Sequence, residues 1–326
     1  MKIAILDDYQ DAARTLTAFR KLAGHDVIAF TEHVRDPDEL ARRLKGVHAL
    51  VLIQQRLALT RSIVERLPPT VRIVSQTGSW TGHIDVTACT ERGIAVGAAG
   101  HTNYHAPAEL AWGLILASLR HLTKEVNGLR AGGWQSTLGL EVYGRTLGIY
   151  AYGNIGSIVA VAGRAFGMRV ICWGREGSTG RARAAGYEVA GSREEFFESS
   201  DIVSLHMPLR PDSRGIVTAQ DLARMKPTAL FVNVSRGALV GDHILAEALM
   251  QGRPGRAAVD VYEEEPIVGG KNPLVGLENC LCTPHIGFVE QDTYERYLGG
   301  AFDRIVAFAA GKPVDIVNPE ALRALR

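Results

Sequence analysis

The chain has 326 residues, of which 46% are hydrophobic and 22% charged, and its formal net charge is +1. This composition is that of a globular protein rather than a disordered or membrane chain, and the length predicts two domains. The two signs of charge are interspersed, which argues against a basic face for nucleic acid or anionic lipid. A small-molecule ligand is expected.

The first hundred residues alternate helical patterns with short apolar runs, namely KIAIL, DVIAF, ALVLI, RIVSQ and IAVG. Such near-continuously apolar runs are typical of strands that are buried on both faces of a parallel sheet. They predict a doubly wound α/β domain. Because the first strand begins at once, without a signal-peptide region, we expect a cytoplasmic protein. Arg56, just after the third run, is a possible cleft residue.

Residues 106–134 predict one long connecting helix, with Pro107 in its first turn and an end near Gly132 and Gly133. A second series of apolar runs follows: TLGIYAY, RVICWG, DIVSLHM, ALFVNVS, AAVDVY and CLCTPH. These predict a second doubly wound domain. A last helix, in QDTYERYLGGAFDRIVAFAAG, could return to the first domain. The expected division is 1–100 with 289–326, and 101–288.

The stretch LGIYAYGNIG, residues 147–156, has the order strand, turn and helix of a dinucleotide-binding loop. Gly153 and Gly156 hold the second and third glycine positions of a GxGxxG pattern, with Asn154 and Ile155 between them, but Ala151 replaces the first glycine. We expect little cost from the alanine if its φ angle stays negative. The alternative is a purely structural turn.

The next strand ends at Gly174 and Arg175, where an NAD site usually has an acid for the ribose hydroxyls. A guanidinium there could meet the 2′-phosphate of NADP. NADP is therefore the expected cofactor and NAD the alternative. The alternative for Arg175 is that it is a solvent-exposed loop arginine without a role in cofactor binding.

Three later strands end in polar residues, in the segments NVSRGALV, DVYEEEP and TPHIGF. Ligands bind at the carboxyl ends of parallel strands, so these segments predict a site that combines an arginine, a carboxylate and a histidine. An arginine can hold a carboxylate and polarise a carbonyl, while a histidine beside an acid can donate a proton. The pattern indicates reduction of a ketoacid.

Together these motifs resemble those of the D-isomer-specific 2-hydroxyacid dehydrogenases, over nearly the whole chain. The resemblance implies a Rossmann cofactor domain inserted in a smaller flavodoxin-like substrate domain. It implies that Arg236, Glu265 and His285 are catalytic. It further implies a cofactor site lined by residues of LHMPL, NVSRG and DVYEEEP, namely His206, Pro208, Val234, Ser235 and Asp260, with Asp260 on the nicotinamide amide.

In the first domain, QTGSWTGHID resembles the family loop whose backbone holds the substrate carboxylate, which implies Ser79, Trp80 and Thr81. Trp80 stands where glycine is usual, and it could either shape the substrate pocket or pack against a helix. His83, like most of the other histidines, is expected to be solvent-exposed or to cap a helix.

The expected function is transfer of a hydride between NADP(H) and a small 2-keto or 2-hydroxy acid. An NAD-linked enzyme and a non-catalytic NAD(P)-sensing protein are the alternatives. The resemblance suggests a homodimer formed through residues 105–134, with Trp134 near the interface. The four cysteines lack zinc-site spacing, so we expect reduced thiols and no metal, with Cys280 and Cys282 on the same side of a strand.

Overall fold

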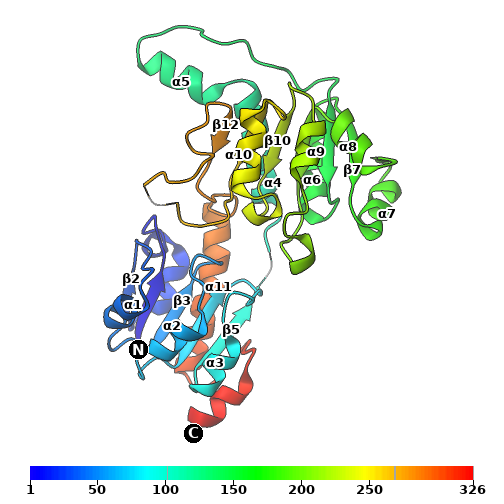
Figure 1. The fold of residues 1–326 in the computed structure, drawn as a ribbon. Helices are drawn as coiled ribbons and strands as arrows, with labels where there is room; N and C mark the ends of the chain where they lie inside the picture. Colours follow the sequence, from blue (N-terminus) through cyan, green and yellow to red (C-terminus); the bar gives the residue numbers. More distant parts are fainter. Residues whose placement is uncertain (101, 268, 326) are drawn as a thin grey trace. The chain divides into compact units, whose positions relative to one another are not determined.

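The structure is a computed structural model that describes residues 1–100, 102–267 and 269–325; residue 101, where a domain boundary is expected, lies outside this part. The chain divides into two compact units, Met1–Thr102 with Glu290–Arg326, and Asn103–Val289. Each unit is built on a parallel sheet with helices on both faces (Figure 1). The predicted fold class, two doubly wound α/β domains, is confirmed.

The first unit has a five-stranded sheet in the order β2-β1-β3-β4-β5. This is the flavodoxin-like order, with a switch point between β1 and β3. Its strands are β1 Lys2–Leu6, β2 Asp26–Ala29, β3 Ala49–Leu52, β4 Ile73–Thr77 and β5 Ala95–Ala99. Its helices are α1 Pro37–Arg43, α2 Arg61–Arg66, α3 Val86–Glu91 and α11 Gln291–Ala309, with 3-10 turns at Ala13–Thr15, Thr17–Leu22 and Pro319–Leu325.

Alternate strand residues of this sheet face opposite helical layers, as the two-residue period of a strand requires. One face packs against α1, α2 and α3 through a buried cluster that includes Leu50, Leu52 and Val74. The long helix α11 contacts β3, β4 and β5, and its residues from 291 onward return the chain to the first unit. Glu290 caps α11 by accepting from two backbone N–H groups of its first turn.

The second unit has a seven-stranded sheet in the order β12-β11-β10-β9-β6-β7-β8. Its strands are β6 Thr146–Tyr150, β7 Arg169–Trp173, β8 Glu188–Val189, β9 Ile202–Leu205, β10 Leu230–Asn233, β11 Arg256–Val259 and β12 Cys280–Cys282. The order reverses between β6 and β9, which is the switch point of a Rossmann sheet. The sequence patterns predict every strand except the two-residue β8.

The helices of this unit are α4 His105–Leu119, α5 Leu122–Arg130, α6 Asn154–Ala165, α7 Glu176–Ala184, α8 Arg193–Ser199, α9 Ala219–Arg224 and α10 Asp242–Met250, with 3-10 turns Pro211–Ser213 and Gly237–Leu239. They cover both faces of the sheet, apart from α5, which has no buried residue and contacts α4. Buried side chains of α4 and α6 form the core on one face. Those of α8, α9 and α10 form the core on the other. No helix among the described residues is long and apolar enough to cross a membrane.

The prediction of a single connecting helix over 106–134 is wrong, because α4 and α5 are separate helices. The chain turns at His121, whose φ of 52° lies in the left-handed region. Arg120 already ends α4 through backbone bonds to Leu116 and Ser118. A non-glycine residue in this conformation gives no clear sequence signal, since the turn is fixed by packing.

Candidate active site

The loop after β6 has the geometry of a dinucleotide-binding turn. A Cβ built on Gly156 would lie 2.7 Å from the carbonyl oxygen of Ala151, so only glycine lets α6 approach the strand this closely. A Cβ built on Gly153 meets no heavy atom within 4 Å, so the space in front of this residue is open. The N-terminus of α6 begins there, with Asn154 and Ile155 in its first turn. Backbone N–H groups at such a helix start favour phosphate.

Ala151 differs from the expectation in one respect. Its φ is 73°, whereas the sequence argument assumed a negative value. The left-handed conformation persists because both backbone groups are engaged: the Ala151 N–H donates to Trp173 (2.7 Å), and its carbonyl accepts from Gly153 (2.9 Å). Ala151 therefore adopts the backbone conformation that glycine would adopt at this position, and an L-residue does so at a cost in conformational energy.

Gly174 has no carboxylate, and the structure gives a steric reason. Its φ is 153°, and a Cβ there would lie 3.1 Å from Ser178 Oγ and 3.4 Å from the Cα of Ala151. The neighbouring Arg175 is the N-cap residue of α7, and its Nη2 lies 2.6 Å from Oδ2 of Asp212 in an ion pair between exposed side chains. Asp212 was not anticipated, and neither was Arg181, whose guanidinium donates to the carbonyl oxygen of Tyr152 (3.1 Å).

The predicted cofactor residues after β9 and β10 differ in burial, and several of them make hydrogen bonds. His206 is buried, with Nε2 2.8 Å from Ser204 Oγ, and burial lowers its pKa to about 3, so the ring is neutral. Pro208 is exposed, and its carbonyl oxygen accepts from Ser213 Oγ. Val234 is buried, and Ser235 Oγ donates to the carbonyl oxygen of Leu205 (2.7 Å).

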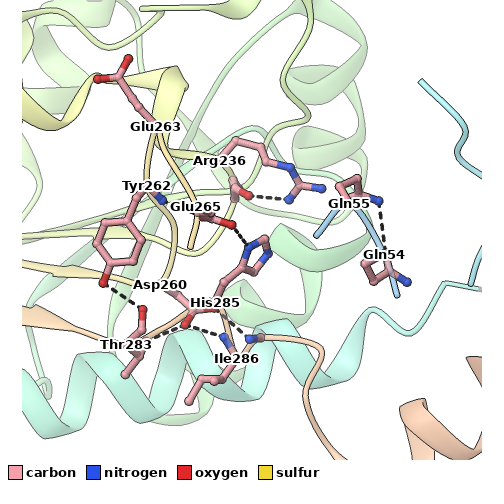
Figure 2. Close-up of polar contacts among 12 residues, drawn as sticks. Gln54, Gln55, Arg236, Asp260, Tyr262, Glu263, Glu265, Thr283, His285 and Ile286 are labelled. Carbon is pink, nitrogen blue, oxygen red and sulfur yellow. Dashed lines mark hydrogen bonds and ion pairs between the residues drawn. The ribbon is translucent and has the colours of Figure 1, made fainter. Parts of the chain in front are cut away.

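Arg236, Glu265 and His285 come together at the carboxyl end of this sheet (Figure 2). Nδ1 of His285 lies 2.5 Å from Oε2 of Glu265, and the other carboxylate oxygen accepts from the backbone N–H of Tyr262 (2.9 Å). Burial alone would raise the pKa of Glu265, but the hydrogen bond and charge of His285 outweigh it, so that pKa lies below its usual value. The carboxylate is therefore ionised.

Arg236 lies on the loop between β10 and the 3-10 turn that follows. Burial lowers the pKa of its guanidinium, and the charge of Glu265 acts in the opposite direction. A Cβ on the next residue, Gly237, would lie only 2.1 Å from the carbonyl carbon of Tyr262. This glycine lets the arginine loop touch the loop that carries Glu265, and it was not singled out from the sequence.

Asp260 is fully buried and anchors the histidine loop. Its carboxylate accepts from the hydroxyl of Thr283 (2.6 Å) and from the backbone N–H groups of Ile286 and Gly287 (both 2.8 Å). Burial raises the pKa of this carboxyl, while those hydrogen bonds act to lower it. The structure thus gives Asp260 a positioning role that the sequence did not suggest.

The turn holds His285 in a left-handed conformation, with φ of 52°, which is the kind of strain found at functional sites. The imidazole also meets the ring of Phe288 edge to face, with centroids 5.5 Å apart. The histidine is therefore restrained by its backbone, by Glu265 and by an aromatic neighbour.

The predicted substrate loop lies in the first unit, directly after β4, and contains Ser79, Trp80 and Thr81. The Trp80 indole is 56% exposed and stacks on the ring of His83, with centroids 5.4 Å apart and an interplanar angle of 15°. A Cβ on Gly82 would lie 2.3 Å from the indole, so glycine makes room for it. Trp80 thus rests on its own loop.

One expectation in this unit, that for His83, needs correction. His83 is not a freely exposed ring, because it lies beneath Trp80 and burial lowers its pKa to about 4. Arg56 makes contacts inside its own unit: its guanidinium donates to the carbonyl oxygen of Asp7 (2.6 Å) and to the hydroxyl of Tyr294 (2.8 Å), and it stacks on Tyr9. The described residues contain no cluster of three potential metal ligands.

The fold and the site define an α/β protein with a dinucleotide-type turn and an Arg–Glu–His group in one unit. The model of the D-isomer specific 2-hydroxyacid dehydrogenase NAD binding domain matches residues 112–287. A glyoxylate reductase from Aeropyrum pernix is 37% identical over 265 residues, 78% of each chain. A phosphoglycerate oxidoreductase structure from Vibrio cholerae o395 is 47% identical, covers 95% of this chain and 99% of its own, and has a TM-score of 0.91. The chain belongs to the D-isomer specific 2-hydroxyacid dehydrogenase family.

Proposed function

We propose that the protein reduces small 2-ketoacids to D-2-hydroxyacids with NADP(H), using Arg236, Glu265 and His285. The observation that carries the proposal is the contact of 2.5 Å between His285 and Glu265, beside the partly buried Arg236. A histidine hydrogen-bonded to an ionised carboxylate can hold a proton and deliver it to a developing alkoxide.

The residues present suit a dinucleotide, since Gly153 leaves open space in front of the start of α6 and Gly156 allows the helix to pack closely. When bound, the nicotinamide would supply the hydride. Arg236 would hold the substrate carboxylate and polarise the ketone, because a guanidinium fork matches a carboxylate in charge and shape. Glu265 would orient the imidazole of His285, which would give its proton to the carbonyl oxygen.

The remaining assignments follow from the same proposal. We assign His206, Pro208, Val234 and Ser235 to the cofactor site, and Asp260 to the nicotinamide amide as well as to the histidine loop. The loop Ser79, Trp80 and Thr81 would hold the substrate carboxylate through its backbone. The substrate itself would be a small 2-ketoacid such as glyoxylate or hydroxypyruvate.

The choice of NADP rests on Gly174 and Arg175. A side chain at Gly174 would be strained, so the site lacks the acid that binds the ribose diol of NAD and repels a phosphate. A charge-assisted contact from Arg175 would contribute about 1.5–3 kcal/mol, roughly 10-fold to 150-fold in affinity. The ion pair of Arg175 with Asp212 favours the NAD-linked alternative, because it occupies the same guanidinium.

The specificity constants for NADPH and NADH test this choice. Arg175→Ala should abolish an NADPH preference, whereas Asp212→Asn should strengthen it by freeing the guanidinium. Asp303→Asn, in the other unit, is the matched control and should leave the ratio unchanged. A parent enzyme that prefers NADH would refute the NADP assignment without affecting the catalytic group.

We further infer a homodimer formed through residues 105–134. Helix α5 has no buried side chain, and several large apolar residues on it and just after it are exposed, namely Leu122, Val126, Leu129, Trp134 and Leu138. Apolar residues gathered in this way mark interaction surfaces. Light scattering of the parent protein should give twice the mass of the chain, and Leu129→Asp should reduce it toward the monomer.

A further inference from the structure

Cys280 and Cys282 lie at alternate positions of β12, an edge strand of the seven-stranded sheet. Side chains two residues apart in a strand point to the same face, and here the two Sγ atoms are only 3.6 Å apart. Both residues are partly exposed. The other two cysteines, Cys89 and Cys172, are completely buried.

The pair has the chemical features of a reactive dithiol. A thiolate is the attacking species in thiol–disulfide exchange, and the hydrogen bond between the two sulfurs lowers the pKa of Cys282 below its usual value. At Cys282 burial acts against the hydrogen bond, whereas at Cys280 the hydrogen bond and burial both raise the pKa. Once Cys282 has reacted, the second sulfur is already in contact with it.

We propose that Cys280 and Cys282 form a dithiol modification site that closes to an intrastrand disulfide when it meets a low-molecular-weight disulfide. The Cys282 thiolate attacks one sulfur of the reagent, which forms a mixed disulfide and releases one small thiolate. Cys280 then attacks the Cys282 sulfur, the protein disulfide forms, and the second small thiolate leaves. The protons of the two cysteines pass to the released thiolates, and two electrons pass from the cysteine pair to the reagent.

Closure should disturb the histidine loop, a consequence that rests on the proposed function. At about 3.3 Å per residue, the two Cα atoms are about 6.6 Å apart, near the upper end of the range of about 4.4–6.8 Å for disulfides. The bond should therefore shorten β12 and pull on Thr283. The carbonyl oxygen of Thr283 accepts from the Tyr262 hydroxyl (2.9 Å), and its own hydroxyl donates to Asp260, so the strain reaches the anchor of His285.

The site is tested by peptide mass spectrometry of the reduced full-length protein after treatment with oxidised glutathione. The peptide that contains both cysteines should lose two hydrogen atoms, and dithiothreitol should restore them. Cys89 and Cys172 should remain thiols in the same sample, which makes them internal controls. Free thiols at both positions, or a separate glutathione on each, would overturn the proposal.

The variants Cys280→Ser and Cys282→Ser provide the matched comparison. Each should form only a mixed disulfide at its remaining cysteine. In the parent, oxidation should remove most of the ketoacid reductase activity and dithiothreitol should return it, whereas the double serine variant should keep its activity. Unchanged activity in a protein with the disulfide would refute the link to His285. The mass measurement tests whether the disulfide forms, and its result does not depend on whether the protein reduces ketoacids.

Discussion

Replacing Gly237 with alanine tests whether the contact between two loops sets the position of Arg236, the proposed substrate-binding arginine. A Cβ at this position would lie 2.1 Å from the carbonyl carbon of Tyr262 and 2.5 Å from the backbone nitrogen of Glu263. Ordinary contacts begin near 3.4 Å, so the two backbones must separate by roughly 1 Å. Both neighbours are main-chain atoms, and no flexible side chain can absorb the change.

The expected loss follows from that displacement. Overpacking of this kind costs about 1–3 kcal/mol of stability. A shift of about 1 Å in a group that positions the substrate can reduce the rate by about 10²-fold. We therefore expect Gly237→Ala to lower kcat/KM for a 2-ketoacid by about 10²-fold while NADPH binding changes little.

The assay is NADPH oxidation with glyoxylate or hydroxypyruvate, together with fluorescence titration of NADPH and thermal unfolding. Gly180→Ala is the matched control, because it lies in α7 and a Cβ there meets nothing within 4 Å. That variant should keep full activity and, as a helical glycine, gain up to about 1 kcal/mol. If Gly237→Ala keeps parental kcat/KM in a folded protein, the positioning argument is wrong.

Three further substitutions test other parts of the site. Ala151→Gly should stabilise the protein by about 1 kcal/mol in chemical denaturation, because a left-handed conformation costs an L-residue about 1–2 kcal/mol. The control is Ala131→Gly, which should not stabilise the protein because the φ of Ala131 is −83°. Equal changes in stability for the two variants would exclude strain at Ala151. Glu265→Gln should move the upper pH limit of ketoacid reduction to lower pH, since a neutral amide no longer favours imidazolium, and an unshifted profile would contradict the pairing. Arg236→Lys should lose kcat/KM but keep NADPH binding, because lysine cannot form the fork, and equal loss of both would indicate misfolding.

The strands were predictable from the sequence because parallel strands buried on both faces must be apolar throughout. That signal is strong for runs such as LGIYAY and absent for β8, whose two residues Glu188 and Val189 lie at the sheet edge. The break at His121 had no such signal, since both flanking segments have helical patterns. Local composition predicts that helices form, but packing decides where one ends and another begins.

At the site, residue types were predictable and their conformations were not. An arginine, an acid and a histidine at strand ends indicate chemistry by type alone. The positive φ of Ala151 and the steric demand at Gly174 depend on neighbours that fold against them. The partner of Arg175 is Asp212, 37 positions away in the sequence, and only the folded chain brings the two charges together.

The most direct test of the proposed activity is the effect of His285→Asn on NADPH-dependent reduction of a small 2-ketoacid. The asparagine variant should bind NADPH as the parent does but turn over about 10²-fold more slowly or worse, the range for loss of general acid catalysis. A folded variant with turnover close to that of the parent would remove His285 from the mechanism and contradict the proposed active site.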